Sequence, residues 1–590
     1  MSERLTGVIE RINGSLILGK FKEEPKMGDL IEVGNLKLMG EIVRLSQDIA
    51  YIQCYESTSG IKPGEPVVDI GTPLVAELGP GLMAQIVDGI SRSETKLWDL
   101  TGPFITRGTN IAPLDREKKW NFEPLVKPGD EVSGGDFIGQ VQETESFVHK
   151  IMVPPNQTGV IKSIDEGEFT VTDTIGVLTT ENGDVDLKMM QTWPVRVGRP
   201  IKERLALSQP LITGQRVIDT FFPCAKGGAS AVPGGFGTGK TVTLQQIAKW
   251  SDADIIVYIG CGERGNEMAD VVDQFPEIED PRSGKKLIER TIIVANVSNM
   301  AVSAREASIY MGITIGEYFR DMGYDVSLMA DSTSRWAEAL RDISGRLEEI
   351  PAEAGFPAYL ADRIASIYER SGRVKVPATE DRYGSLTLLG AVSPPGGDYS
   401  EPVTTTTLRF IGTFWALDSQ LAYRRHFPAI NWLRSFSRYL DVAARWWSEL
   451  DPTWEETRSQ ALRILEEAAE IEETARIIGE KALPDDQRLV LLLAEMLREG
   501  FLVQSAFHEV DRYCPPEKQV KLLRLFTDFY NTVRPLIEQG VPIDQVRELD
   551  AIRDIMRLKE YEGEEPIDNA RAQMMSEIDA LADQYEVESA

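Results

Sequence analysis

The sequence has little of what a secreted or metal-binding protein would need. It contains only four cysteines, Cys54, Cys224, Cys261 and Cys514, and their spacing shows no paired pattern. Scattered cysteines of this kind predict reduced thiols in a cytoplasmic protein rather than a disulfide framework. There are also only three histidines in the chain. A zinc site, which draws several ligands from Cys and His, is therefore not expected.

Long apolar runs are missing as well. The longest clean run near the C-terminus, Leu489 to Ala494, falls far short of the roughly 20 residues that cross a bilayer. The chain starts Met-Ser-Glu-Arg-Leu-Thr, which carries charge at once and lacks the apolar centre of a signal peptide. We therefore expect neither a transmembrane helix nor direct insertion into lipid.

Positive charge is scarce relative to negative charge. The chain has 63 Lys and Arg against 93 Asp and Glu, so its net charge is −30 at pH 7. Nucleic-acid phosphates and anionic lipid both attract basic surfaces, so direct binding to either is not expected. Hydrophobic residues make up 42% of the 590 positions, which is enough for several packed cores. At about 100–200 residues per domain, the length allows roughly three to five domains.

The N-terminal third has the pattern of β structure. In residues 1–70, short runs that alternate polar and apolar residues lie between glycines, which predicts a small β-barrel. We treat residues 71–109 as a connecting segment. Residues 110–190 again contain strand-like runs and turn signals, so they predict an inserted β module. Part of this module is similar to biotinyl and lipoyl carriers, which present a lysine on an exposed hairpin turn. Here Lys150 precedes a strand-like run, and a structural module is favoured over a carrier.

Residues 195–435 alternate between strand-like and helical segments. The strand-like runs are 229–232, 255–259, 291–295 and 326–330, and the clearest helical segment is 299–322. Nearly continuous apolar runs are typical of parallel strands that are covered on both faces. Beyond about residue 440 glycine becomes rare, and an apolar face repeats at helical spacing at Leu489, Leu492, Leu493, Met496 and Leu497.

The predicted fold is therefore a multidomain α/β protein. An N-terminal β-barrel and an inserted β module precede a nucleotide-binding α/β domain at 195–435, and a helical domain at 440–590 follows it.

A glycine-rich loop carries the strongest chemical signal. Gly234, Gly235, Phe236, Gly237, Thr238, Gly239, Lys240 and Thr241 fit the pattern G-x-x-x-x-G-K-[ST], and Val242 follows. A β run precedes the loop and a helix-compatible segment follows, which is the context this phosphate-binding motif requires. Backbone N–H groups and the helix N-terminus would hold phosphate oxygens. Lys240 would reach the β- and γ-phosphates, and Thr241 would ligate Mg²⁺. A glycine-rich turn that matches by chance lacks this context and is disfavoured.

Carboxylates follow two of the strand-like runs. Asp331 ends the run 326–330, where an α/β sheet binds ligands, so we assign it to Mg²⁺. The alternative is the N-cap of a helix expected over 334–341. Glu263 and Arg264 emerge from the run 255–259 between glycines. Glu263 could orient the attacking water and Arg264 could neutralise phosphate charge. From spacing alone a surface salt bridge is equally good, and Glu267 is a rival base.

Several segments taken together resemble the A subunit of archaeal A-type and vacuolar V-type rotary ATPases. They are the glycine-rich loop and the segments 262–267, 329–336, 394–398, 428–431 and 435–437. The β module at 110–190 is similar to the insertion that separates these A subunits from F-type β subunits and type III secretion ATPases. The resemblance extends along nearly the whole chain.

This resemblance implies roles that spacing does not supply. Glu263 falls at the family's catalytic carboxylate, and Arg264 and Arg335 fall where the family contacts the terminal phosphate. Phe427 corresponds to the aromatic residue that stacks on adenine, and Phe507 to the other side of that pocket. The alternative for both phenylalanines is ordinary core packing. An intact phosphate loop with Glu263 also separates this chain from the non-catalytic B subunit.

The resemblance further implies an assembly. The A subunits alternate with B subunits in a ring around a central stalk, and each B subunit supplies an arginine finger to a neighbouring site. Peripheral stalks and a membrane sector couple ATP synthesis or hydrolysis to H⁺ or Na⁺ movement, at the cytoplasmic face of the cell membrane. ATP and ADP are the substrates and Mg²⁺ is the cofactor.

One residue departs from many vacuolar relatives, which carry cysteine where this chain has Thr238. Redox switching at that position is therefore not expected.

Three rival functions remain at this stage. A hexameric secretion ATPase is disfavoured by the segment 110–190, and a Rho-like helicase by the negative charge. A non-catalytic nucleotide-binding ring subunit is disfavoured by Glu263 and the complete loop.

Overall fold

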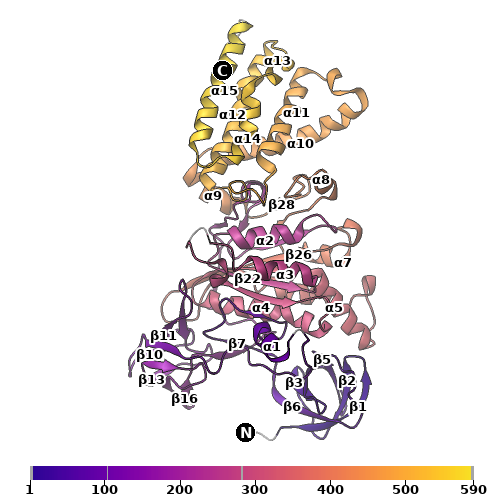
Figure 1. The fold of residues 1–590 in the computed structure, drawn as a ribbon, viewed down its shortest axis with the longest axis vertical. Helices are drawn as coiled ribbons and strands as arrows, with labels where there is room; N and C mark the ends of the chain where they lie inside the picture. Colours follow the sequence, from indigo (N-terminus) through magenta and orange to yellow (C-terminus); the bar gives the residue numbers. More distant parts are fainter. Residues whose placement is uncertain (1–3, 103, 281–282, 586–590) are drawn as a thin grey trace.

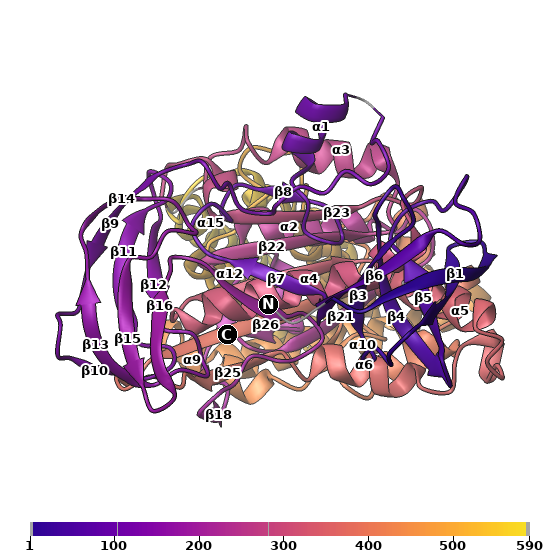
Figure 2. The same cartoon turned by 90° about the horizontal axis from the view of Figure 1, so that it is seen from below.

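The computed structural model describes residues 4–102, 104–280 and 283–585. The molecule is elongated, with the two β domains at one end, a mixed sheet in the middle and a helical domain at the other end (Figure 1). Seen from below, the barrel and the β module lie on opposite sides of the chain's central part (Figure 2). This order confirms the predicted multidomain α/β class.

The N-terminal domain is a closed six-stranded barrel with the strand order β1-β2-β5-β4-β3-β6. Its strands are β1 (Thr6–Asn13), β2 (Leu16–Phe21), β3 (Asp29–Val33), β4 (Leu38–Ser46), β5 (Ile49–Cys54) and β6 (Pro66–Pro73). Successive side chains of a strand point to opposite faces, and Ile17, Ile31 and Ile52 point inward and are completely buried. The alternation seen in the sequence therefore forms the barrel core.

The inserted module is a pair of four-stranded antiparallel sheets, ordered β12-β11-β9-β14 and β10-β13-β15-β16. The strands are β9 (Trp120–Pro124), β10 (Glu131–Val132), β11 (Phe137–Gln142), β12 (Val148–Met152), β13 (Gly159–Ile164), β14 (Gly167–Phe169), β15 (Gly176–Thr180) and β16 (Gly183–Leu187). Lys150 lies within β12, and its ammonium donates a hydrogen bond to Gln140 on the neighbouring β11. It is not on an exposed hairpin turn, so the carrier interpretation is wrong.

The middle of the chain is a largely parallel sheet with the main strand order β28-β27-β21-β26-β24-β22-β23-β8. Its strands are β8 (Ile86–Val87), β21 (Ala229–Pro233), β22 (Ile255–Cys261), β23 (Thr291–Asn296), β24 (Asp325–Asp331), β26 (Tyr383–Val392), β27 (Thr413–Phe414) and β28 (Phe436–Ser437). All residues of β21, β22 and β23 are buried, as the apolar runs predict. Strand β8 comes from the segment 71–109 and pairs with β23 at the sheet edge.

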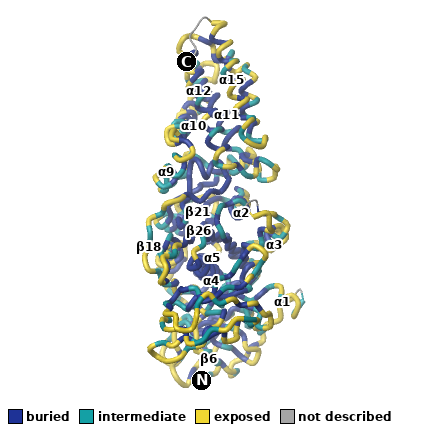
Figure 3. Tube along the Cα trace, turned by 90° about the vertical axis from the view of Figure 1, so that its left-hand side faces the viewer, coloured by how far each residue is buried: buried dark blue, intermediate teal, exposed yellow. Residues whose placement is uncertain are grey.

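Helices cover both faces of this sheet. Apolar residues of α2 (Lys240–Trp250) and α3 (Gly265–Gln274) share one core with Ile256 and Met329. Those of α4 (Val302–Asp321) and α5 (Thr333–Arg346) share the other core with Val257 and Leu328. Burial on both faces is why these strands lack polar alternation. Figure 3 shows the buried residues along the middle of the molecule.

The C-terminal domain is helical, as predicted. Its main helices are α9 (Leu440–Leu450), α10 (Trp454–Ile478), α11 (Asp485–Leu497), α12 (Pro516–Glu538), α14 (Asp550–Arg557) and α15 (Glu565–Gln584). Leu489, Leu493 and Met496 of the predicted apolar face are buried within α11. Within the described ranges, no helix combines the length and apolar character needed to cross a membrane.

Candidate functional site

A cavity of about 600 Å³ opens at the carboxyl ends of the parallel strands. It brings together residues from the glycine-rich loop, from the segment after β22, from the end of β24 and from the first turn of α5. The predicted site residues that line it are Gly234, Phe236, Gly237, Gly239, Lys240, Thr241, Val242, Glu263, Arg264, Asp331, Arg335 and Phe427. Gly235, Thr238 and Phe507 are not among its lining residues.

The glycine-rich loop connects β21 to α2, in the strand–loop–helix context that the motif requires. Gly239 has φ +88° and directly precedes the helix, a conformation that favours glycine. A Cβ on Gly234 would lie 2.4 Å from the Thr238 Oγ1 atom, so the loop is closed tightly on itself. Thr238 is buried and its hydroxyl donates to the Gly235 carbonyl oxygen at 2.8 Å. It therefore stabilises the loop from inside.

Lys240 is folded back onto the loop. Its Nζ donates to the carbonyl oxygens of Gly234 and Gly235 at 2.8 and 2.9 Å. Burial lowers the pKa of Lys240, while the nearby carboxylates of Asp331 and Glu263 act in the opposite direction. The ammonium is thus partly desolvated and held by neutral acceptors. From this position the side chain can exchange these hydrogen bonds for contacts with phosphate oxygens.

Asp331 is the last residue of β24 and is 1% exposed. Its Oδ2 atom accepts a hydrogen bond from the Tyr258 hydroxyl at 3.2 Å. Its Oδ1 atom is buried without a hydrogen-bond partner among the described residues. The N-cap of α5 is Ser332, whose side chain accepts from the Arg335 backbone N–H, so the capping alternative for Asp331 is wrong.

The unpartnered oxygen bears on the predicted metal. Burial raises the pKa of Asp331, and the Thr241 hydroxyl and the Lys240 ammonium counteract that rise. A buried carboxylate oxygen is costly unless it has a partner. Oxygen donors from one carboxylate and one hydroxyl suit Mg²⁺, which retains several waters and binds phosphate oxygens. The residues present therefore fit a Mg²⁺–nucleotide complex.

Glu263 lies between β22 and α3, and its carboxyl faces the cavity. Burial and then the charge of Asp331 raise its pKa to about 7, and a hydrogen bond with Glu267 adds to the rise. The backbone of this loop is fixed, since the Ser298 N–H donates to the Glu263 carbonyl oxygen at 2.9 Å. A carboxylate whose pKa lies near neutrality is suited to accept a proton from water.

The two predicted arginines differ in their environment. The guanidinium of Arg264 lies over the Phe236 ring at 5.0 Å from its centre, a cation–π contact at the cavity wall. Arg335 is in the first turn of α5 and pairs with Glu338 at 3.3 Å, with a side chain 44% exposed. Both side chains line the cavity, and these weak contacts leave them able to move to an anionic ligand.

The two predicted aromatic residues are not equivalent. Phe427 lines the cavity, and a Cβ on Gly239 would lie 3.6 Å from its ring. Its carbonyl oxygen accepts from the Gln504 N–H at 2.8 Å, which ties the two segments together. Phe507 is 91% exposed and does not line the cavity. Ordinary core packing does not describe it, and its role at the adenine stays a prediction.

Several cavity residues were not predicted. Gln245 lies in the second turn of α2, and Ser393, Pro394 and Gly396 come from the segment after β26. The sequence marked 394–398 only as a family element. Tyr258, which contacts Asp331, was included only as part of an apolar run. A tyrosine within an otherwise aliphatic buried strand was the available signal, since its hydroxyl must find a partner.

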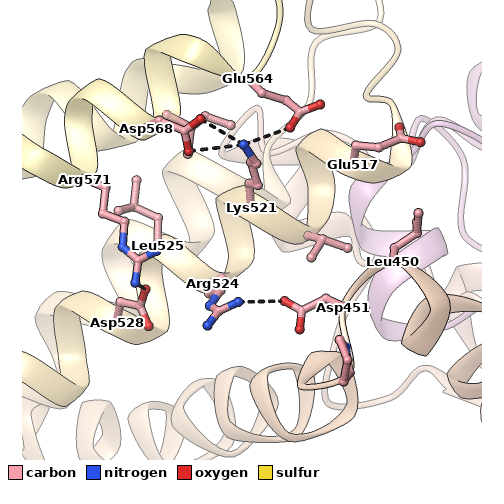
Figure 4. Close-up of a pocket in the computed structure, with 13 residues that line it drawn as sticks. Leu450, Asp451, Glu517, Lys521, Arg524, Leu525, Asp528, Glu564, Asp568 and Arg571 are labelled. Atoms are coloured by element: carbon pink, nitrogen blue, oxygen red, sulfur yellow. Dashed lines mark hydrogen bonds and ion pairs between the residues drawn. The ribbon is translucent and has the colours of Figure 1, made fainter.

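A second cavity, of about 360 Å³, lies in the C-terminal domain (Figure 4). Its cations are paired: Lys521 with Glu564 and Asp568, Arg524 with Asp451, and Arg571 with Asp528. It contains none of the predicted site residues. Five carboxylates line it against these three cations, so no cation is left over to hold an anionic ligand.

The chain matches the sequence profiles of four domains, in order. They are the ATP synthase alpha/beta family β-barrel domain at residues 9–71, the barrel-sandwich domain of the alpha/beta subunits at 111–196, the alpha/beta family nucleotide-binding domain at 214–437, and the C-terminal domain of V- and A-type ATP synthases at 444–547. The third of these contains the cavity residues described above, from Gly234 to Phe427.

Relatives that match along nearly the whole chain agree with these profiles. The A subunit of the A-type ATP synthase of Thermofilum pendens is 54% identical over 100% of this chain and 98% of its own length. That of Methanopyrus kandleri is 56% identical over 96% of both chains. The V-type ATP synthase alpha chain of Acetivibrio thermocellus is 55% identical over 94% of both chains.

A solved structure shows the same fold at low identity. The assembled ATPase EscN of the type III secretion system of enteropathogenic E. coli matches with a TM-score of 0.63 at 20% identity, over 88% of this chain and 99% of its own. Because more than half of its residues are identical to those of the synthase proteins above over nearly their full length, the chain belongs to the A subunits of A-type and V-type ATP synthases, within the ATP synthase alpha/beta family.

Proposed function

We propose that this chain is the catalytic subunit of a rotary ATP synthase and that the cavity beside the glycine-rich loop is its catalytic site. The site interconverts ATP with ADP and phosphate. The observation that carries the proposal is the meeting of Lys240, Thr241, Glu263 and Asp331 in one cavity. Family membership indicates the class of reaction, and the cavity lining indicates which residues carry it out.

The residues divide the chemistry among them. Backbone N–H groups of the loop and the N-terminus of α2 hold the phosphates. Lys240 moves from its carbonyl acceptors to the β- and γ-phosphates, and Arg264 and Arg335 turn toward the terminal phosphate. The Glu263 carboxylate orients the attacking water in hydrolysis and accepts its proton. In synthesis the same groups position inorganic phosphate against ADP.

Asp331 and Thr241 would hold Mg²⁺ through the Oδ1 atom and the hydroxyl oxygen. When bound, the ion would neutralise charge on the β- and γ-phosphates. The chain's own contribution is a carboxylate that is already desolvated and held by its other oxygen. Little reorganisation is then needed when the nucleotide arrives.

The proposal includes partners. The chain would alternate with B subunits in a ring, and a B subunit would supply an arginine finger to the cavity. Stalk subunits and a membrane sector would couple the reaction to H⁺ or Na⁺ movement at the cytoplasmic face of the membrane. Support comes from membership in a multisubunit synthase family.

The secretion-ATPase alternative is not favoured. Its representative shares the fold but only 20% of aligned residues, whereas the A-type synthase relatives share more than half over nearly the full length. The barrel-sandwich module at 111–196 also matches the synthase family. The general test is MgATP hydrolysis by the complex assembled around this chain, and an inactive complex with intact nucleotide binding would contradict a catalytic role.

The adenine pocket gives one prediction. Phe427→Ala should weaken binding of ADP and ATP alike by about 1–3 kcal/mol, the usual size of a base–aromatic stack. A ring that stacks on adenine contacts the base and not the γ-phosphate, so its loss should weaken both nucleotides equally. Equilibrium binding of both nucleotides to the purified chain measures the effect. Tyr423→Ala, which changes an 87% exposed aromatic outside the cavity, should alter neither affinity. A loss confined to ATP would contradict the stacking role.

A further inference from the structure

Tyr258 is a buried polar residue that the catalytic scheme above does not use. It lies on β22 with 1% of its surface exposed, next to the strand that ends in Asp331. In the parallel register Tyr258 is opposite Met329, and Gly260 is opposite Asp331. Residues two apart on a strand point to the same face. The Tyr258 side chain therefore projects on the face that carries the Asp331 carboxylate.

Neighbouring residues fix the direction of the ring. Phe275 packs edge-on against Tyr258, with ring centres 6.0 Å apart. Gly260 leaves the space beside it to Met268, since a Cβ there would lie 2.0 Å from the Met268 sulfur. The hydroxyl of the ring thus reaches the Asp331 Oδ2 atom at 3.2 Å. The ring has apolar neighbours and only its end is polar.

The hydrogen bond from Tyr258 makes the surroundings of the two carboxylate oxygens of Asp331 different. Oδ2 accepts from Tyr258, and Oδ1 has no hydrogen-bond partner among the described residues. A phenol is protonated at neutral pH, so the Tyr258 hydroxyl acts as the donor in this contact. A carboxylate held at one oxygen presents the other in a fixed direction.

We propose that Tyr258 is a positioning residue for the nucleotide site: its hydroxyl holds Asp331 by Oδ2 so that Oδ1 is directed at the metal position beside Thr241. The inference rests on the proposed assignment of Asp331 to Mg²⁺. Tyr258 itself is not among the residues that line the cavity. It acts through the carboxylate, as the outer partners of metal ligands do.

Tyr258→Phe tests the proposal because it removes one hydroxyl and keeps the ring. Loss of an outer partner typically lowers metal affinity about 10–100-fold. The Mg²⁺ concentration that gives half of the metal-dependent gain in ADP affinity should rise by a factor of about 10 or more. ADP affinity measured with EDTA should not change. The measurement is equilibrium ADP binding to the full chain at increasing Mg²⁺, and it requires no turnover.

Tyr55→Phe is the matched control. Tyr55 is also buried and donates to a carboxylate, Glu41 Oε2 at 2.6 Å, but it lies in the barrel domain. The Tyr55→Phe variant should lose thermal stability, and the Mg²⁺ dependence of its ADP binding should not change. If Tyr258→Phe also loses stability without a shift in Mg²⁺ dependence, its hydroxyl only satisfies a core contact and the proposal is overturned.

Phe275→Leu keeps the Tyr258 hydroxyl and loosens the position of its ring. The Mg²⁺ concentration for half of the effect should therefore rise, but by less than in Tyr258→Phe. This variant serves if Tyr258→Phe does not fold.

The Asp331→Asn variant tests the assignment of Asp331 to Mg²⁺ separately from the role of Tyr258. If Asp331 holds the metal, the variant should lose most of the Mg²⁺ effect, and adding Tyr258→Phe to it should change nothing more. An unchanged Mg²⁺ dependence in Asp331→Asn would overturn the metal assignment itself. A strong effect of Asp331→Asn with none from Tyr258→Phe or Phe275→Leu would overturn only the role of Tyr258.

Discussion

Replacing Glu263 with glutamine should reduce turnover of the assembled complex about 10²–10⁴-fold, the usual contribution of a positioned acid–base group. The substitution keeps the shape of the side chain and removes the carboxylate that we propose orients and deprotonates water. Nucleotide binding should survive, because in the proposed site the loop and Lys240 hold the phosphates independently of Glu263. Steady-state hydrolysis together with equilibrium ATP binding separates the two effects.

Glu267→Gln is the informative comparison. Glu267 lines the same cavity, lies in the first turn of α3 and hydrogen-bonds with Glu263. Its loss removes a contact that raises the pKa of Glu263 and leaves the Glu263 carboxylate in place. Turnover should fall much less than in Glu263→Gln. Near-normal turnover in Glu263→Gln, with collapse in Glu267→Gln, would transfer the catalytic role to Glu267.

The purified chain alone should bind MgATP and hydrolyse it very slowly. An arginine finger contributes about 10³–10⁵ in rate, or about 4–7 kcal/mol at 1.36 kcal/mol per decade. The cavity's own arginines, Arg264 and Arg335, contact Phe236 and Glu338. In the proposed assembly they do not replace the finger of the B subunit. Single-turnover hydrolysis measures the deficit, with light scattering to exclude self-assembly.

Adding the neighbouring B subunit provides the control for this second prediction. The intact B subunit should restore most of the rate, and a variant without its finger arginine should restore little, although it still assembles. Nucleotide affinity of the chain should change far less than the rate. If the monomer hydrolyses ATP as fast as the ring, the site is complete within one chain and the interfacial account is wrong.

The sequence specified the fold class and the phosphate loop well, for physical reasons. Apolar strand runs are buried on both faces here, and Gly237 and Gly239 in the loop have the positive φ that glycine adopts easily. Local patterns of this kind need no knowledge of distant residues. The assignment of Asp331 to a strand end also rested on such a pattern.

Contacts between distant segments were harder to predict. The partners of Tyr258 and Arg264 depend on how β22, β24 and the loop meet, and spacing does not encode that. The exposed position of Phe507 also depends on contacts between distant segments. Gln504, three residues before it, donates a backbone hydrogen bond to the Phe427 carbonyl oxygen. The position of Lys150 within β12 agrees with the structural module that the sequence favoured over a carrier.

Ion-driven ATP synthesis in vesicles tests the central claim most directly. Complexes that contain either the wild-type chain or the Glu263→Gln chain are reconstituted, and an ion gradient is imposed in the presence of ADP and phosphate. The account predicts ATP formation by the wild-type complex that stops when an ionophore collapses the gradient, and none above background with Glu263→Gln. Equal ATP formation by both complexes would contradict it, because the cavity described here would then not be where ATP is made.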